Sequence, residues 1–212
     1  MIIVEGVDKV GKTTLCKILS EQLPDHTSVH NDIPKRTAFQ EHMECLTKYG
    51  NNSIIDRLHW SEYCYGLTYR NDPGYTILEW NSIESLCVDN YAIVIYLVGE
   101  DQEALIKRWE FEEKFSKDKL QSLQSHYDEL ANNSNLQVYK ADVYSLITSL
   151  GKPTPALYNI LEEYAFLQEK INSGMKMSPK LRNVTDSIRI LNTGGLSWRM
   201  VQGSVETPTL ES

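Results

Sequence analysis

Two hydrophobic patterns alternate along most of the chain. Short continuous apolar runs predict buried strands, and longer segments with an apolar residue every three or four positions predict helices. The expected strands are 2–4, 28–30, 53–56, 92–98 and 136–141. The expected helices are 13–23, 34–50, 59–69, 76–90, 101–114, 117–132 and a short one from Asp142. Because strands and helices alternate, we expect an α/β fold with three layers, α/β/α, around a parallel central sheet.

The pattern changes at residues 151–155, which read Gly-Lys-Pro-Thr-Pro. Two prolines in three residues mark a boundary between elements. We therefore expect a core at 1–150 and a C-terminal extension at 151–212, made of one helix and an irregular tail. The predicted helix at 154–171 has one apolar face, so it should pack against the core or against a second subunit.

Composition and charge narrow the choice of partners. The chain has 212 residues, which suits one domain, and a net charge of −8 without any block of basic residues. We therefore expect neither nucleic acid nor membrane as a partner, since the longest apolar run, 92–98, is too short to cross a bilayer. The four cysteines lack the spacing of a zinc site and indicate reduced thiols. These features favour a cytoplasmic protein, in the host cytoplasm if the source is a virus.

The first candidate for chemistry is the segment between the first strand and the first helix. Gly6-Val-Asp-Lys-Val-Gly-Lys-Thr13 fits the phosphate-loop pattern G-x-x-x-x-G-K-[ST] at every fixed position. Small residues let successive main-chain N–H groups surround phosphate oxygens, and the following helix directs its positive end toward the same anion. Lys12 should reach the β- and γ-phosphates of ATP, and Thr13 should bind Mg²⁺. The predicted ATP-binding residues are Gly6, Val7, Asp8, Lys9, Val10, Gly11, Lys12, Thr13 and Thr14.

Kinases, switches and motors all carry phosphate loops, and a second motif indicates which of these classes the chain resembles. Glu5-Gly-Val-Asp-Lys9 resembles the E-G-x-D-basic start of thymidylate kinases. Residues 56–65 are similar to that family's D-R-Y-x-x-S-x-x-A-Y and match it at Asp56, Arg57, Ser61 and Tyr65. Weaker likeness continues through Arg70 and covers roughly residues 1–150. The order of the two motifs makes this resemblance more specific than either motif alone.

The resemblance implies a P-loop kinase fold and transfer of the ATP γ-phosphoryl group to a deoxynucleoside monophosphate, dTMP or a related pyrimidine nucleotide. Carried over to this sequence, Arg57 would hold the acceptor phosphate and Asp8 would contact the sugar. Ser61, Tyr65 and Arg70 would complete the acceptor site. Lys9 would add positive charge at the transferring group, beside Lys12 and Mg²⁺.

Three further assignments are less constrained by the motifs. Asp56 either anchors Mg²⁺ through water or orients Arg57. Arg36 either contacts the acceptor or lies in solvent. A basic lid is expected after the strand at 92–98, where Arg108 is the candidate for a catalytic cation among several lysines that include Lys117 and Lys119.

The chain also departs from the thymidylate kinase pattern. Fewer residues than usual separate the phosphate loop from Asp56, so a helix that normally helps to choose the base is shortened or replaced. Leu58 stands where the family has an aromatic residue. These differences leave the accepted base open.

Other functions remain as alternatives. One is a deoxynucleoside kinase, whose general base would be Glu41 or Glu44, and another is a kinase of a modified pyrimidine. A kinase of bases within DNA is disfavoured by the acidic charge. A nucleotide-binding switch without catalysis is disfavoured, because the sequence contains no N-K-x-D-like motif that would recognise guanine. The resemblance also implies a homodimer.

Overall fold

The computed structural model describes residues 1–32, 34–99, 102–110 and 116–173. Its sheet has five parallel strands in the order β2-β3-β1-β4-β5. The strands are β1 (Ile2–Glu5), β2 (Thr27–His30), β3 (Ser53–Asp56), β4 (Ile93–Val98) and β5 (Gln137–Asp142). All residues of β1 and β3 are buried, because helices cover both faces of a parallel sheet.

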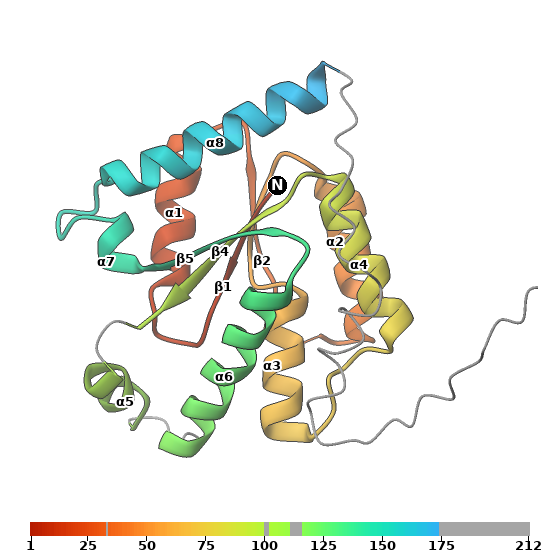
Figure 1. Cartoon of the computed structure of the whole chain (residues 1–212), viewed down its shortest axis with the longest axis vertical. Coiled ribbons are helices and arrows are strands. Elements are labelled where there is room, and N and C mark those ends of the chain that lie inside the picture. The colour runs from red at the N-terminus through yellow and green to blue at the C-terminus, as the bar shows by residue number, and fades with distance from the viewer. Residues whose placement is uncertain (33, 100–101, 111–115, 174–212) are drawn as a thin grey trace, which may run out of the picture.

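Helices flank the sheet on two sides. They are α1 (Lys12–Gln22), α2 (Ala38–Tyr49), α3 (His59–Arg70), α4 (Ile77–Asp89), α5 (Gln102–Glu110), α6 (Lys117–Asn133), α7 (Val143–Leu146) and α8 (Pro155–Asn172). In Figure 1, α1 and α8 lie on one side of the sheet, and α2, α3, α4 and α6 lie on the other. The predicted three-layer α/β/α fold with a parallel sheet is therefore confirmed.

The helix boundaries follow from capping residues. The sequence pattern placed the start of the second helix at Pro34, but α2 begins at Ala38 because the Thr37 side chain accepts a hydrogen bond from the Gln40 N–H. Thr76 and Glu79 form a reciprocal capping box at the start of α4. A hydroxyl at the N-cap satisfies a main-chain donor that has no partner inside the helix, so it fixes the first turn.

The register of the central strands determines which loops meet. In β1 and β3, Val4 lies opposite Asp56, and in β2 and β3, His30 lies opposite Asp56. From β1 the chain crosses over to β2 on one side of the sheet, and from β3 it crosses to β4 on the other. Such a reversal leaves a crevice at the carboxyl ends of the neighbouring strands, where α/β proteins bind ligands.

Aromatic packing fills the layer between the sheet and the helices α3 and α6. Trp60 is fully buried, and the rings of Tyr96 and Tyr127 stack with centroids 5.5 Å apart. All four cysteines are buried and free, as the sequence predicted. Among the described residues, no helix has the length and apolar character needed to span a membrane.

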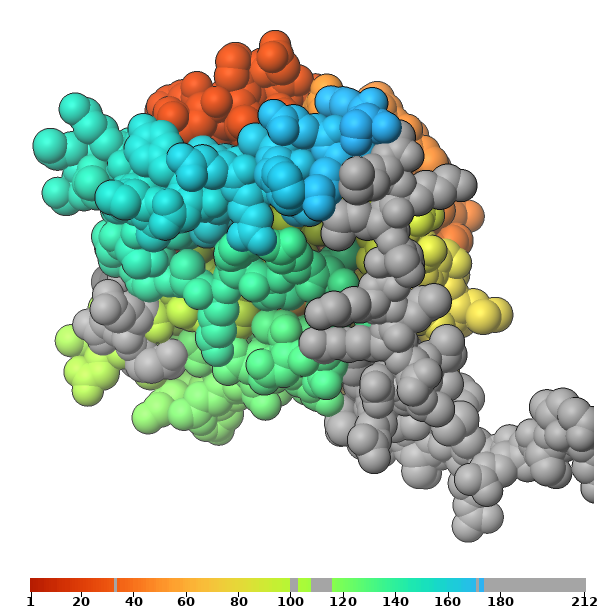
Figure 2. Space-filling view, turned by 45° about the horizontal axis from the view of Figure 1, so that its top comes forward, coloured from red at the N-terminus to blue at the C-terminus, as the bar shows by residue number. Residues whose placement is uncertain are grey.

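Helix α8 packs beside the N-terminal part of the chain. Figure 2 shows α8 in blue lying against the red segment near the start of the sequence. The buried Tyr164 hydroxyl lies 2.8 Å from His26 Nε2, donates to the Asn51 carbonyl oxygen at 3.0 Å and accepts from the main-chain nitrogen of Met1 at 2.9 Å. The irregular tail was predicted to begin at Asn172, and its residues from 174 onward lie outside the described residues.

Replacing Tyr164 with Phe should lower the free energy of unfolding by about 1–3 kcal/mol, because it leaves buried polar groups without their partner. Chemical denaturation measures this difference. Tyr158→Phe is the matched control, since Tyr158 lies on the same helix and is 48% exposed. Equal stabilities of the two variants would contradict the prediction.

Candidate active site

The phosphate loop between β1 and α1 has an unusual main-chain path. Gly6, Lys9 and Gly11 all have positive φ angles, of 140°, 68° and 98°. A side chain at Gly6 would overlap the carbonyl oxygen of Leu97 on β4, and one at Gly11 would approach Val143 Cγ2 to 2.9 Å. The two fixed glycines of the motif are therefore required by close packing, against main chain at Gly6 and against a side chain at Gly11, as well as by the turn.

Lys12 lies folded over this loop. Its Nζ donates to the carbonyl oxygens of Gly6 and Val7, at 2.8 Å each, and lies 3.5 Å from Asp8 Oδ1. Burial, together with the charge of Arg57, lowers the pKa of Lys12, and nearby carboxylates oppose the shift. Phosphate oxygens would offer this ammonium group negatively charged acceptors in place of neutral carbonyls, a stronger interaction.

Asp56, at the end of β3, receives two hydrogen bonds. The Thr13 hydroxyl donates to Asp56 Oδ2 at 2.9 Å, and His30 Nδ1 lies 3.0 Å from the same oxygen. The second carboxylate oxygen, Oδ1, is buried and has no hydrogen-bond partner among the described residues. The structure thus brings together Thr13 and Asp56, the two residues predicted from sequence to serve a metal ion.

Arg57 follows Asp56 in a strained conformation that aims its side chain at the phosphate loop. Its φ is 70°, and its main chain is held by an N–H bond to Val4 O of 3.1 Å and by Asn31 Nδ2, which donates to its carbonyl oxygen at 2.7 Å. The guanidinium group forms an ion pair with Asp8. Burial raises the pKa of the Asp8 carboxyl, but the charges of Lys12 and Arg57 outweigh it and lower that pKa.

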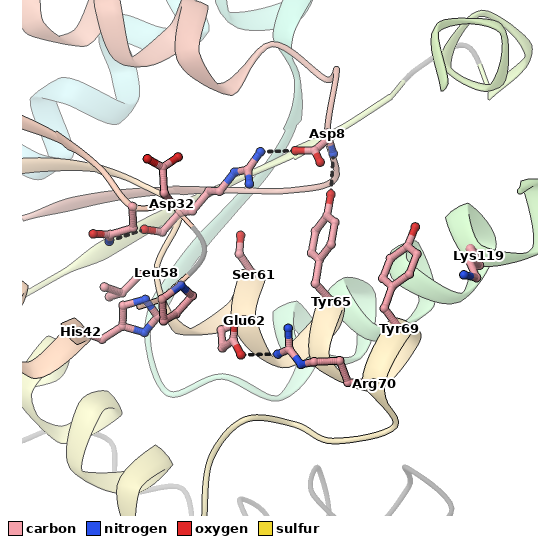
Figure 3. A pocket seen from close by; sticks show the side chains of 13 residues that line it. Asp8, Asp32, His42, Leu58, Ser61, Glu62, Tyr65, Tyr69, Arg70 and Lys119 are labelled. Atoms are coloured by element: carbon pink, nitrogen blue, oxygen red, sulfur yellow. Dashed lines mark hydrogen bonds and ion pairs between the residues drawn. The ribbon is translucent and has the colours of Figure 1, made fainter. Parts of the chain in front are cut away.

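Two adjoining cavities open at this ion pair. The smaller, of about 450 Å³, is lined by Lys9, Gly11, Lys12, Thr13 and Thr14, together with Asp8 and Arg57. The larger, of about 630 Å³, is also lined by Asp8 and Arg57 and continues along α3 past Ser61 and Tyr65. Figure 3 shows Tyr65 reaching from its helix to Asp8, whose main-chain N–H donates to the tyrosine hydroxyl at 3.0 Å. A group in one cavity can therefore meet a group in the other beside Asp8 and Arg57.

Comparison with known structures identifies the fold. No protein-family model and no curated protein matches the chain. The chain is similar to the YorR protein from Bacillus subtilis, solved in complex with phosphorylated GDP, with 23% identity, a TM-score of 0.62, and coverage of 81% of this chain and 97% of that one. The chain has the P-loop kinase fold.

Two further solved structures are more distant. A thymidylate kinase from Candida albicans has 15% identity and a TM-score of 0.49, over 77% of this chain and 91% of that one. A deoxyadenosine kinase from M. mycoides with bound dCTP has 17% identity and a TM-score of 0.40, over 82% of this chain and 100% of that one.

Within this kinase fold, Glu5 fixes helix α3 to the end of β1. The fully buried carboxylate accepts hydrogen bonds from the Leu58 N–H at 2.8 Å and from the Ser61 hydroxyl at 2.5 Å, and Ser61 Oγ lies 2.8 Å from the Tyr127 hydroxyl. Burial raises the pKa of Glu5, and its hydrogen bonds oppose that shift. Ser61, predicted to contact the acceptor, lines the larger cavity but already uses its hydroxyl in this network.

The remaining predicted residues are distributed unevenly around the two cavities. Arg70 lines the larger cavity. Arg36 does not line either of these two cavities; it is 59% exposed and binds Glu44 at 2.5 Å. Arg108 belongs to α5, but its side chain lies outside the described residues. Lys119, a lid candidate, lines the larger cavity with its Nζ 4.3 Å from the ring centroid of Tyr69.

Several cavity residues were not predicted. They are Asn31, Asp32, Pro34, His42, Leu58, Glu62 and Tyr69. Glu62 could have been found, since it follows Ser61 within the second motif and precedes Tyr65 by one helical turn. His42 gives no such signal, because it belongs to a separate helix that only the folded chain brings to the cavity.

Gly6→Ala should abolish binding of a fluorescent ATP analogue and lower the free energy of unfolding by about 2–4 kcal/mol, because the new methyl group would overlap β4. Titration of the analogue and chemical denaturation measure the two effects. Gly50→Ala is the control: Gly50 has a φ of 55°, but its added methyl group would meet nothing within 4 Å. It should cost only about 1–2 kcal/mol and preserve binding. Binding by the Gly6 variant at the wild-type affinity would contradict the assigned loop geometry.

Proposed function

We propose that the protein transfers the γ-phosphoryl group of ATP to a deoxynucleoside monophosphate, dTMP or a related pyrimidine nucleotide, and forms the diphosphate. One observation carries this proposal: the two cavities share a border. Arg57 and Asp8 line both the smaller cavity at the phosphate loop and the larger cavity along α3. Direct phosphoryl transfer needs donor and acceptor phosphates side by side, with fixed cations between them.

Each cation has a distinct place in this scheme. Lys12 and the loop amides hold the β- and γ-phosphates. Lys9, an exposed residue, lines the same smaller cavity and adds positive charge at the transferring group. Arg57 holds the acceptor phosphate and is freed from Asp8 when the acceptor arrives. Asp8 then becomes available to a sugar hydroxyl. Arg108 is proposed as the lid cation that closes over the transferring group.

Thr13 and Asp56 are the residues that would hold Mg²⁺. A hydroxyl that donates to a carboxylate keeps an oxygen lone pair for the metal, and the unpartnered Asp56 Oδ1 is a hard oxygen acceptor of the kind Mg²⁺ and its water molecules bind. Among the described residues, no group of three or more His, Cys, Asp or Glu side chains could form a metal cage by itself. This fits a metal held largely by water and nucleotide phosphates, where it neutralises the charge of the β- and γ-phosphates.

The second candidate function is a deoxynucleoside kinase. Glu41 and Glu44, the general bases that the sequence suggested, bind Arg36 away from both cavities. The position of Asp32 keeps this function open, because this carboxylate residue lines the larger cavity two residues after the end of β2. It would have to lie within hydrogen-bond reach of the nucleoside 5′-hydroxyl to remove its proton.

A coupled assay of ADP release separates the functions. ATP with Mg²⁺ should give rapid ADP formation only when a deoxynucleoside monophosphate is added. ADP formation with deoxynucleosides but not with their monophosphates would favour the second candidate. Slow ADP formation that is independent of any acceptor would indicate a switch.

Arg57→Ala should lower kcat/KM for the monophosphate at least about 100-fold, since it removes a charge-assisted bond to the acceptor phosphate. Arg57→Lys should retain part of the activity, because the lysine ammonium group keeps the positive charge but cannot bind a phosphate through two parallel N–H groups. Lys152→Ala, which removes an exposed cation near the start of α8, should leave kcat/KM unchanged. Wild-type turnover by the Arg57→Ala variant on every monophosphate would refute the proposed acceptor site.

Asp56→Asn should raise the Mg²⁺ concentration needed for half-maximal activity by about tenfold. The same variant should bind Mg²⁺-free ATP with the wild-type affinity, because the loop amides and Lys12 remain. Activity assays at increasing Mg²⁺ concentration measure the Mg²⁺ requirement, and calorimetry without Mg²⁺ measures the affinity for ATP. An unchanged Mg²⁺ requirement would remove Asp56 from the metal site.

A further inference from the structure

The larger cavity ends in a polar wall on the side away from the phosphate loop. Figure 3 shows His42, Glu62 and Arg70 in that order along this side, with Asp8 across the cavity from them. His42 comes from α2, and the other two residues from α3. If the acceptor phosphate lies at Arg57, the far wall is the part of the cavity that a nucleobase would reach.

Glu62 and Arg70 form a fixed acceptor–donor pair. Arg70 Nη2 donates to Glu62 Oε1, and the carboxylate side chain is only 14% exposed. Two glycines make room for the pair: a side chain at Gly66 would approach Arg70 Nη2 to 2.9 Å, and one at Gly74 would approach Glu62 Oε1 to 2.7 Å. An ionised carboxylate only accepts hydrogen bonds, and a guanidinium group only donates them.

His42 adds a second donor. It is 3% exposed, and burial, with a further contribution from His59, lowers its pKa to about 3, so its ring is neutral at pH 7. Its Nδ1 lies 2.5 Å from the hydroxyl of Tyr75, itself a buried residue. If the tyrosine hydroxyl donates to Nδ1, no buried hydroxyl hydrogen is left without a partner, and the imidazole proton is then on Nε2.

We propose that His42, Glu62 and Arg70 read the base of the acceptor as a donor–acceptor–donor series and select a pyrimidine with carbonyl groups on both sides of a ring N–H. Uracil and thymine have this edge: O2 and O4 accept, and N3–H donates. This inference rests on the proposed function, and it names the residues that would determine base choice.

The other bases do not match the donor–acceptor–donor series, either at its central acceptor, Glu62, or at one of the two flanking donors. Cytosine N3 and adenine N1 are acceptors, so each would direct a lone pair at the Glu62 carboxylate. Guanine has the central N–H, but its amino group would meet a second donor. A base lone pair is repelled by the carboxylate, so rejection arises from this repulsion as much as from the matching contacts.

The test compares dUMP with dCMP, which differ only in this edge. The wild-type protein should show kcat/KM for dUMP at least about 100-fold above that for dCMP. Glu62→Gln should reduce this ratio to about tenfold or less, because a carboxamide can either accept from N3–H or donate to N3. Calorimetric titration of each nucleotide without ATP should show the same change in the ratio of Kd values. Glu162→Gln, an exposed carboxylate on α8, is the charge-matched control.

Arg70→Gln provides an independent variant in case Glu62→Gln does not fold. It should raise KM for dUMP about tenfold with little change in kcat, because the base contact lies away from the reacting phosphates. Turnover of 2′-deoxyribose 5-phosphate, which has no base, should be equal in the variant and the wild type.

Four outcomes would overturn the inference: a dUMP to dCMP ratio near one in the wild type, a preference for dCMP or a purine nucleotide, an unchanged ratio in Glu62→Gln, or equal losses on dUMP and on the baseless acceptor in Arg70→Gln. Failure of the proposed function looks different, because then no monophosphate of any base supports ADP formation.

Discussion

The ion pair between Asp8 and Arg57 joins the two halves of the candidate active site. Asp8 belongs to the phosphate loop, and Arg57 follows β3, more than forty residues later in the chain. The pair forms because β1 and β3 are neighbours in the sheet with Val4 opposite Asp56, so their carboxyl ends reach the same edge. Both cavities border on this pair, and every proposed step of phosphoryl transfer depends on their shared boundary.

Buried polar networks hold that boundary in place. Glu5 ties the start of α3 to the end of β1, and Asn31 holds the main chain of Arg57 in a left-handed conformation. Each of these groups lies where a missing partner would leave a buried polar atom unsatisfied. The site is therefore positioned by hydrogen bonds that link the ends of neighbouring strands to the segments that follow them.

The candidate base wall is assembled differently from the phosphate end. It needs α2, α3 and the connection that brings Tyr75 to His42. The thymidylate kinase resemblance leaves this region open, since the segment between the phosphate loop and Asp56 is short. The structure fills the space with His42 of α2 and with the Glu62–Arg70 pair, for which Gly66 and Gly74 leave room.

The sequence alone determined the fold class, the approximate positions of the strands and most helices, and the phosphate loop. These features depend on local signals: hydrophobic period, glycines at positive φ, and the lysine and threonine that follow them. Local pattern could not place Arg36, which pairs with Glu44 away from the cavities, or show that the Ser61 hydroxyl is engaged by Glu5. Nor could it place His42 in the same cavity as Glu62, because that arrangement depends on how α2 and α3 pack on one face of the sheet. Tertiary structure alone decided those neighbours, since strand register and helix packing set distances between residues that are far apart in sequence.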